Sequence, residues 1–201
     1  MSLFAAAENR ATVLPKSNIT NPLDWFRDFS GGSKTSSGVN VGPENAVSLS
    51  TVFNALTLLS ESVAQLPIAP YLTETIENGL EQNRKFKEHP SYQIVSKRPN
   101  DWMNSDTFRK AMMNHATRYD NAYALIDRNG IGRVKTMIPL HPQRVEPKIT
   151  SDNRLIYVVD GTERLSPMSI FHLVGYTENG IWGKSRINIL KECLGNALAT
   201  E

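Results

Sequence analysis

The stretch Gly183-Lys184-Ser185 comes closest to a motif that could do chemistry. A glycine, a lysine and a serine at the start of a helix resemble the end of a phosphate-binding loop, whose backbone amides hold phosphate oxygens. The leading glycine of such a loop would stand at position 178, which is Glu178, and no expected strand runs directly into it. We therefore expect a plain helix N-terminus capped by Ser185, with anion binding there as the alternative.

A second glycine pair, Gly130-Ile131-Gly132, begins like the fingerprint of a dinucleotide-binding site. The third glycine of that fingerprint is replaced by Lys135. The pair also falls on an expected β-turn, whereas the fingerprint needs a strand that runs into a helix. The sequence therefore gives no support for a dinucleotide site.

The histidines and the single cysteine show neither a metal-binding nor a nucleophile pattern. No HExxH helix and no G-x-S-x-G elbow is present. Cys193 falls inside an amphipathic helix, and a lone cysteine excludes an internal disulfide. We expect no catalytic residue, no cofactor and no metal; the alternative is an enzyme that uses Gly183–Ser185 or a triad assembled from distant residues. The histidines, for which we expect structural roles, are His89, His115, His141 and His172.

Composition is that of an ordinary soluble globular protein. The chain has 201 residues, of which 40% are hydrophobic and 21% charged, and its formal net charge is +2. So small a charge makes no case for a nucleic-acid or membrane surface, and no apolar run approaches the ~18 residues of a transmembrane helix. Basic residues gather locally, either as a solvated surface around a turn or as a phosphate site, at Arg84, Lys85, Lys87, Lys97 and Arg98.

The rest of the chain is organised around a helix followed by an antiparallel meander. The apolar spacing predicts the helix over residues 105–119, with Ser105 or Asn104 as its cap. Asn129-Gly130 predicts a type I′ hairpin turn, because that turn needs φ > 0 at both central residues. A helix packed on small antiparallel sheets is an α+β fold. The strands, where the apolar period changes from 3.6 to 2, are expected at residues 121–128, 134–140, 144–149 and 155–160.

A longer helix precedes this unit. Its apolar stripe runs over residues 48–66 and includes Phe53 and Leu59, with Ser48 or Ser50 as the cap. The smaller expected elements are an edge strand at 67–74 with a partner after a turn at 77–79, short helices at 90–96 and 166–169, a strand at 170–174, and a loop at 177–184 with exposed Ile181 and Trp182.

The N-terminal region is expected to be a flexible arm. Within it, residues 21–29 predict a short helix whose aromatic side chains Trp25, Phe26 and Phe29 need a surface to bury against, which is either the main core or a neighbouring subunit. Residues 30–43 are rich in Gly and Ser and have little capacity to form a core. The expected division is an arm and linker at 1–47, an α+β body at 48–184, and the start of a long helix at 185–201.

Several segments, in a fixed order, carry a resemblance to a known family over roughly residues 38–201. One of them reads Asn-Ala-Tyr-Ala-Leu-Ile from Asn121, with Asp120 where the family usually has glycine. Taken together, the chain resembles the portal proteins of tailed bacteriophages of the long-tailed type. The segments are Gly38–Tyr71, Glu88–Arg128 with its His89-Pro90 and Arg98-Pro99-Asn100, Ile138–Pro147 and Ile170–Ile187.

The resemblance implies a structural protein of the virion rather than an enzyme. Family members are about twice as long, so the chain looks like an N-terminal arm, a portal wing-type domain and the start of a helix toward the stem. It implies a homo-oligomeric ring of about twelve subunits at a capsid vertex, through which double-stranded DNA passes non-specifically during packaging and ejection. Implied partners are the major capsid protein, the terminase large subunit and a head-tail adaptor protein, with no membrane. The implied location is the virion, and the host cytoplasm during assembly. The alternative is another ring component of the virion, such as an adaptor or minor head protein.

For the aromatic residues Trp25, Phe26 and Phe29, the resemblance leads us to expect a contact with a neighbouring subunit or with the capsid.

Overall fold

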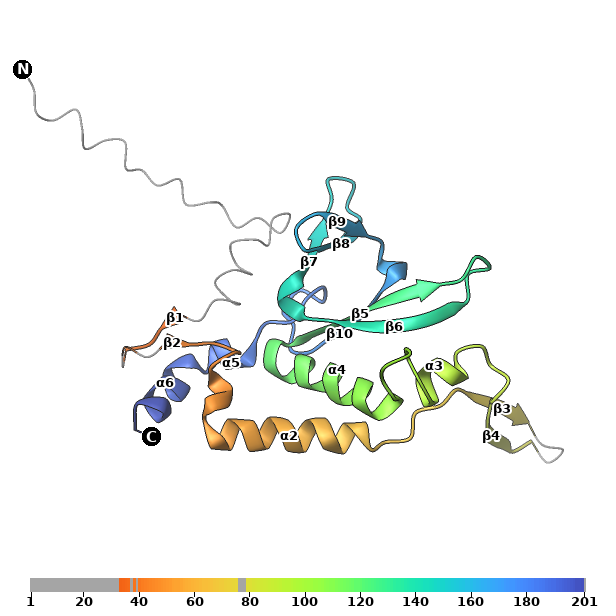
Figure 1. The fold of residues 1–201 in the computed structure, drawn as a ribbon, viewed down its shortest axis with the longest axis horizontal. Coiled ribbons are helices and arrows are strands. Elements are labelled where there is room, and N and C mark those ends of the chain that lie inside the picture. Colours follow the sequence, from red (N-terminus) through yellow and green to blue (C-terminus); the bar gives the residue numbers. More distant parts are fainter. Residues whose placement is uncertain (1–32, 37, 39, 76–78, 201) are drawn as a thin grey trace, which may run out of the picture.

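The computed structural model describes residues 33–36, 38, 40–75 and 79–200. Two helices lie side by side, α2 (Ser50–Ala64) and α4 (Ser105–Tyr119), and α4 packs against a three-stranded sheet (Figure 1). A second three-stranded sheet stands beyond the first. The α+β prediction is confirmed, whereas the helix predicted at 21–29 lies outside the described residues.

Helix α4 begins and ends as its sequence predicts. Asn104 is the N-cap, and its Oδ1 accepts a hydrogen bond of 2.7 Å from the backbone N of Thr107. The helix ends at Asp120, whose φ of +55° lies in the left-handed region. This reversal sends the chain directly into strand β5.

The first sheet has the order β10-β5-β6, with both pairs antiparallel. Its central strand buries both faces: Ala122 and Ala124 pack against α4, whereas Tyr123 belongs to a core shared with the second sheet. Successive side chains of a strand point to opposite faces of the sheet. Strand β5 therefore contributes to the packing against α4 on one face and against the second sheet on the other. The strands are β5 (Asn121–Arg128), β6 (Val134–Leu140) and β10 (Ile170–Val174).

The expected single meander is wrong, because the chain leaves the first sheet after β6. Residues Pro142–Arg144 form the 3₁₀ turn η3, and Pro142 is fully buried there. Proline lacks the N–H that continued pairing would require, so the chain turns into a separate sheet instead. That sheet, of order β7-β8-β9, consists of β7 (Val145–Ile149), β8 (Leu155–Val159) and β9 (Glu163–Leu165), and the turn η4 (Pro167–Ser169) leads to β10.

The turn between β5 and β6 also differs from the prediction. Neither Asn129 nor Gly130 has a positive φ; the positive value, +81°, falls at Gly132. The Asn129 side chain accepts hydrogen bonds from the backbone N of Ile131 and of Arg133, at 3.2 and 2.9 Å. Asparagine therefore closes a longer loop with its own side chain and does not form the two-residue type I′ turn.

Helix α2 buries only part of the predicted apolar stripe, and small residues complete its buried side. Leu56, Ser60 and Ala64 are its buried residues, whereas Phe53 is 56% and Leu59 is 49% exposed. Ser60 can lie inside because its hydroxyl donates to the carbonyl of Leu56 at 2.7 Å. Small residues on the side of α2 that faces α4 let the two helices approach closely. A search of the sequence for large apolar residues at helical spacing does not find such a side. Its N-cap is Leu49, and no serine side chain caps it.

Two hairpins and a short helix complete the described N-terminal half. The predicted edge strand and its partner are confirmed as an exposed hairpin, although the strand begins at Tyr71 rather than at Pro67. The Gly/Ser-rich segment was expected to form no core, yet its Val41 is fully buried with Ala46 and Ile187. The elements are β1 (Ser33–Lys34), β2 (Asn40–Val41), η2 (Ala46–Ser48), β3 (Tyr71–Thr75), β4 (Glu81–Lys85) and α3 (Tyr92–Ser96).

The helix expected over residues 185–201 is two helices in the structure. Helix α5 (Arg186–Ile189) and helix α6 (Lys191–Thr200) meet at Leu190, which is 57% exposed. Helix α6 packs on strand β2, and a Cβ on Gly195 would lie 2.5 Å from the side chain of Thr35. The C-terminal helix is therefore held against the first described segment, and the division at residues 47 and 184 stays a prediction.

Candidate functional site

Asp120 is the point at which the end of α4 meets the segment after β10. The residue is fully buried. Its Oδ1 accepts a hydrogen bond of 2.9 Å from the backbone N of Tyr176, and its Oδ2 accepts one of 2.8 Å from the backbone N of Arg186. One carboxylate therefore fixes both the loop after β10 and the first turn of α5.

The charge of Asp120 is compensated where it lies. Nε of Arg186 is 2.8 Å from Oδ1, and the arginine side chain is 55% exposed while the aspartate is 0% exposed. A buried carboxylate is costly unless it is paired and hydrogen-bonded. Two backbone N–H groups and one guanidinium meet that requirement, so this arrangement positions the chain and leaves no free group for catalysis.

Gly175 and Gly183 are required by the close approach to Asp120. A Cβ on Gly183 would lie 1.8 Å from the carbonyl oxygen of Asp120, and a Cβ on Gly175 would lie 2.5 Å from its Oδ1. The backbone N of Gly175 donates to that same carbonyl at 2.8 Å. A side chain at Gly183 would have to push two pieces of backbone apart, which no rotamer change can relieve, and one at Gly175 would displace the Asp120 carboxylate from its hydrogen bonds.

The motif Gly183-Lys184-Ser185 binds its own chain and not an open anion site. Ser185 is the N-cap residue of α5, but its hydroxyl does not bond to the helix; it donates to the carbonyl of Arg118 at 3.1 Å. The backbone N–H that would meet an anion is that of Arg186, and Asp120 already accepts its hydrogen bond. Nζ of Lys184 is 2.9 Å from Glu178 Oε1. The expected cap position is confirmed, but the serine side chain makes no capping bond, and the carboxylate of Asp120 takes the place that a phosphate would need.

The place where Asp120 holds the end of α4 to the loop after β10 is called the Asp120 joint below. His172 of strand β10 contacts this joint through Asn121. Its Nε2 donates to Asn121 Oδ1 at 3.1 Å, and its Nδ1 accepts from the hydroxyl of Tyr157 at 3.1 Å. The amide oxygen of Asn121 also accepts from the backbone N of Gly183 at 2.7 Å. Burial lowers the pKa of His172 to about 4, so the imidazole is neutral near pH 7. This histidine has the structural role that the sequence predicts.

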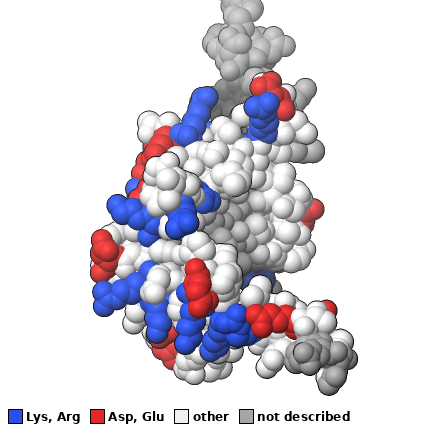
Figure 2. Space-filling view, turned by 90° about the vertical axis from the view of Figure 1, so that its right-hand side faces the viewer, with Lys and Arg blue, Asp and Glu red and all other residues white. Residues whose placement is uncertain are grey.

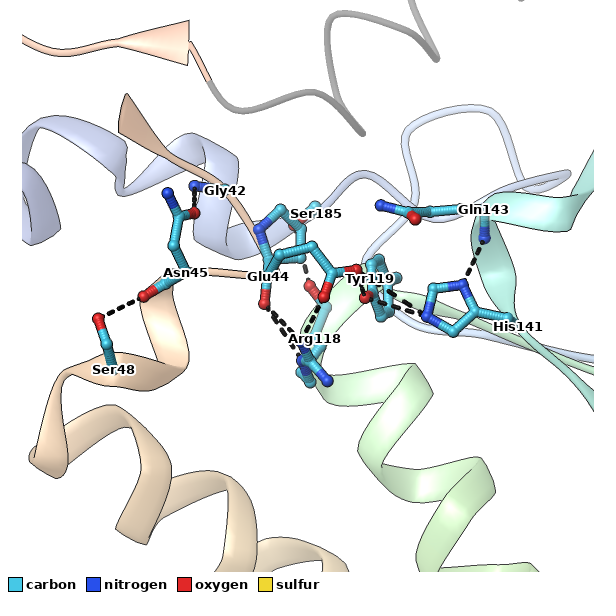
Figure 3. A network of polar contacts seen from close by, with 10 residues as sticks. Gly42, Glu44, Asn45, Ser48, Arg118, Tyr119, His141, Gln143 and Ser185 are labelled. Carbon is cyan, nitrogen blue, oxygen red and sulfur yellow. Dashed lines mark hydrogen bonds and ion pairs between the residues drawn. The ribbon is translucent and has the colours of Figure 1, made fainter. Parts of the chain in front are cut away.

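A polar network joins the segment before α2 to the end of α4 (Figure 3). Nη2 of Arg118 lies 3.1 Å from Glu44 Oε2, and the hydroxyl of Tyr119 donates a short hydrogen bond to the other oxygen of Glu44. Nδ1 of His141 accepts a hydrogen bond of 3.4 Å from the backbone N of Gln143. The proton of this imidazole is therefore on Nε2, which donates to the hydroxyl oxygen of Tyr119 at 3.3 Å. Burial and the bond to Glu44 raise the pKa of Tyr119 far above its usual value.

His115 borders this network without a polar partner. Its ring is edge-on to that of His141, with centroids 5.5 Å apart, and its Nδ1 is buried with no hydrogen bond. Burial first, and then the charges of His141 and Arg118, lower the pKa of His115 to about 4. Within residues 33–200, apart from the undescribed gaps, no three His, Cys, Asp or Glu side chains are grouped to hold a metal ion.

The other residues singled out by sequence are dispersed. Trp25, Phe26 and Phe29 lie outside the described residues. Trp182 was expected to be exposed, but it is only 6% exposed, in a loop whose own side chains of Asn179 and Thr177 hydrogen-bond its backbone. Cys193 is exposed on α6.

Figure 2 shows a face of the molecule on which both signs of charge are interspersed, and the basic residues of 84–98 likewise have acidic neighbours. Arg84 is ion-paired to Glu74 at 2.8 Å, and Lys85 and Lys97 line a shallow pocket that also contains Asp106. Interspersed, largely exposed charges are what a solvated surface shows. The described part of the chain has no helix long and apolar enough to cross a membrane.

Sequence reasoning missed Asp120 as the centre of the joint. A signal was present, because an aspartate stands where the resemblance places a glycine, directly after a helix. Such a position adopts the left-handed conformation, and Asp tolerates it better than most residues with a side chain. Its carboxylate partners are 56 and 66 residues further along the chain, and no local pattern could identify them.

Comparison with known proteins gives a consistent result for the same region. Residues 50–201 match the family described as phage portal protein. The portal protein of Enterobacteria phage HK97 is 29% identical over 165 residues, which are 81% of this chain and 38% of that protein. The chain therefore spans well under half the length of this relative.

Solved structures share the fold. A chain in the neck of an empty gene transfer agent (GTA) particle with C6 symmetry has a TM-score of 0.59 and 17% identity, covering 79% of this chain and 45% of that one. The crystal structure of an HK97 family phage portal protein from Corynebacterium diphtheriae has a TM-score of 0.52 and 18% identity, covering 84% and 48%. A neck chain of a native GTA particle with C12 symmetry has a TM-score of 0.51 and 17% identity, covering 88% and 47%.

Proposed function

Because this chain belongs to the phage portal protein family, we propose that it is a subunit of a ring at one capsid vertex, through which DNA is packaged and later ejected. The family match over residues 50–201 carries this proposal. The C6 and C12 symmetry of the neck particles with the same fold supports a ring, and we propose about twelve subunits.

The described residues contribute the α+β body of such a subunit. Their polar centre, built on Asp120, is satisfied by backbone and by Arg186, so it fixes shape and offers no reactive group. We infer that the protein acts mechanically, without a cofactor, and that energy for packaging comes from a separate motor. The double-stranded DNA would pass without sequence-specific contacts, because many neutralised phosphates would resist sliding.

The proposed partners follow from the position at a vertex. They are other copies of this chain, the major capsid protein, the terminase large subunit and a head-tail adaptor protein. The protein would be part of the virion and would pass through the host cytoplasm during assembly.

Within this proposal, the aromatic residues Trp25, Phe26 and Phe29 contact a neighbouring subunit or the capsid. Deleting residues 1–37 tests this directly. We expect the deletion to reduce assembly into rings or incorporation into capsids, each measured separately. Unchanged assembly and incorporation would contradict the contact, while leaving the portal function in place.

An adaptor or minor head protein is the second candidate, because it would also form a ring in the virion. A nucleotide-binding enzyme is a third, for which Gly183–Ser185 was the sequence argument. Asp120 accepts the hydrogen bond that the phosphate would need, which speaks against it. A thermal shift in millimolar ATP with Mg²⁺ tests the enzyme. Electron microscopy of capsids, with the chain labelled, distinguishes a ring at the vertex from an adaptor below it.

A further inference from the structure

An apolar groove opens between α4, α3 and the sheet β10-β5-β6. It has a volume of about 490 Å³, and Arg109 is its only charged lining residue among those the structure describes. Methionine contributes strongly, and such flexible, polarisable side chains adapt to irregular aromatic partners. Its main lining residues are Phe108, Met112, Met137, Phe171 and Leu173.

The groove lies on the sheet face that packs against α4. Phe171 pairs with Ala124 and Leu173 pairs with Ala122, so these side chains share the face that α4 covers at the alanines. Phe171 is nevertheless 41% and Leu173 39% exposed. The helix covers only part of this face, and the remainder is large apolar side chain in contact with water. Contiguous exposed apolar surface of this kind marks an interaction site.

Charge at the groove is positive. The guanidinium of Arg109 donates to the carbonyl of Ala64 at 2.7 Å, and this arginine also lines the adjoining shallow pocket with Lys85 and Lys97. Asp106 is the one acidic residue in that pocket. Asp106 is ion-paired to Arg109, so the groove continues from an apolar floor into a mouth whose remaining cations are Lys85 and Lys97.

One segment of this chain has the complementary character. Residues 21–29 place three aromatic side chains next to Asp24 and Asp28. Each aromatic side chain can bury ~150–250 Å², which is the surface that an apolar groove supplies. The two carboxylates would meet the cationic mouth while the rings entered the apolar floor.

The position of the tether favours the groove of another copy. Only residues 30–32 separate Phe29 from Ser33, and such a stretch spans about 14 Å at full extension. Ser33 belongs to strand β1, which lies at the α6 end of the molecule, away from α3 (Figure 1). On this basis, and given the ring function proposed above, we propose that residues 21–29 of one subunit dock into the groove of its neighbour.

Cross-linking of the full chain tests this arrangement. In a Cys193→Ser background, Phe29→Cys is combined with Leu173→Cys in the groove or, as a matched control, with Ile131→Cys, which is 75% exposed on the β5–β6 loop. We expect the groove pair to form a ladder of covalent oligomers about tenfold faster than the control pair under mild oxidation, because docking raises the effective concentration of the two thiols.

Equal rates for the two pairs, or a disulfide formed only within one chain, would overturn the proposal. Electron microscopy of the uncross-linked parent separates this outcome from a failure of the proposed function. Rings without a selective ladder contradict the docking and leave the ring intact. If no rings form, the ring function fails and the docking between ring neighbours fails with it.

Discussion

At the scale of single residues, the buried carboxylate of Asp120 holds two separate segments of the chain in place. Asp120 accepts two backbone hydrogen bonds and pairs with Arg186, although it lies outside every helix and strand. Its left-handed backbone conformation is strained for a residue with a Cβ, and its side-chain contacts compensate for that strain. The contributions of this strain and of these contacts to the free energy of unfolding can be separated by substitution.

Replacing Asp120 separates the strain from the contacts. Asp120→Ala leaves two N–H groups and a guanidinium without their acceptor, and we expect a loss of about 3 kcal/mol in the free energy of unfolding. Asp120→Gly loses the same contacts but relieves the positive φ, so we expect it to be about 1 kcal/mol more stable than the alanine variant. Urea denaturation measures both, with Asp152→Ala in an exposed turn as the control. Equal stability of the glycine and alanine variants would contradict the role of strain.

Two partly buried histidines make stability depend on pH. Burial lowers the pKa of His115 and of His172 to about 4, whereas an unfolded histidine titrates near 6.5. The unfolded state therefore binds more protons between these values, so stability is complete above about pH 6.5 and falls toward pH 4, by up to about 3 kcal/mol for each histidine. Carboxylates such as Asp160, whose pKa is lowered by Arg144, act only below this window.

The unfolding free energy measured from pH 7 to pH 4 tests this linkage. We expect His172→Gln to flatten the curve in that window, at some cost in stability at pH 7. His89→Gln, which lies outside both histidine networks, is expected to leave the slope unchanged. The same slope for the wild type and His172→Gln would show that His172 does not drive the effect.

At the scale of elements, the sequence predicts well wherever the decisive contacts are local. The bounds of α4 follow from the Asn104 cap and the apolar period, and the bounds of β5 follow from the change to alternation. The features that the sequence does not predict depend on contacts between residues far apart in the chain. The buried stripe of α2 is set by α4, the burial of Val41 by contact with Ile187, and the break between the two sheets by the packing of Pro142. The role of Asp120 was missed for the same reason, because its hydrogen-bond partners lie 56 and 66 residues further along the chain.

The glycines of the joint provide a test at this scale. Gly183→Ala places a Cβ 1.8 Å from a backbone oxygen, so the loop after β10 must move away from α4. We expect a loss of at least about 2 kcal/mol in unfolding free energy and faster hydrogen exchange at Tyr176 and Arg186. Gly130→Ala is the matched control, because its φ is not positive and its Cβ would meet nothing within 4 Å. If both variants are equally stable, the joint is not closely packed.

At the scale of the whole molecule, the described chain leaves large apolar side chains exposed on separate elements. Leu58 on the outer side of α2 is 68% exposed, and Leu80 near the β3–β4 hairpin is 66% exposed. The hairpin itself is exposed along both strands, and an isolated two-stranded hairpin is marginally stable in water. Such a surface suits a subunit whose neighbours complete it, and this is consistent with the ring that we propose.

Electron microscopy of the purified full-length gene product that contains this chain, with native mass spectrometry on the same sample, tests the central proposal most directly. We predict rings of about twelve subunits with an open axial channel. The same rings should be found at a single vertex when the chain is assembled with the capsid protein. A chain that stays monomeric both alone and with capsid protein, or that forms a ring with a closed centre, would contradict the portal function.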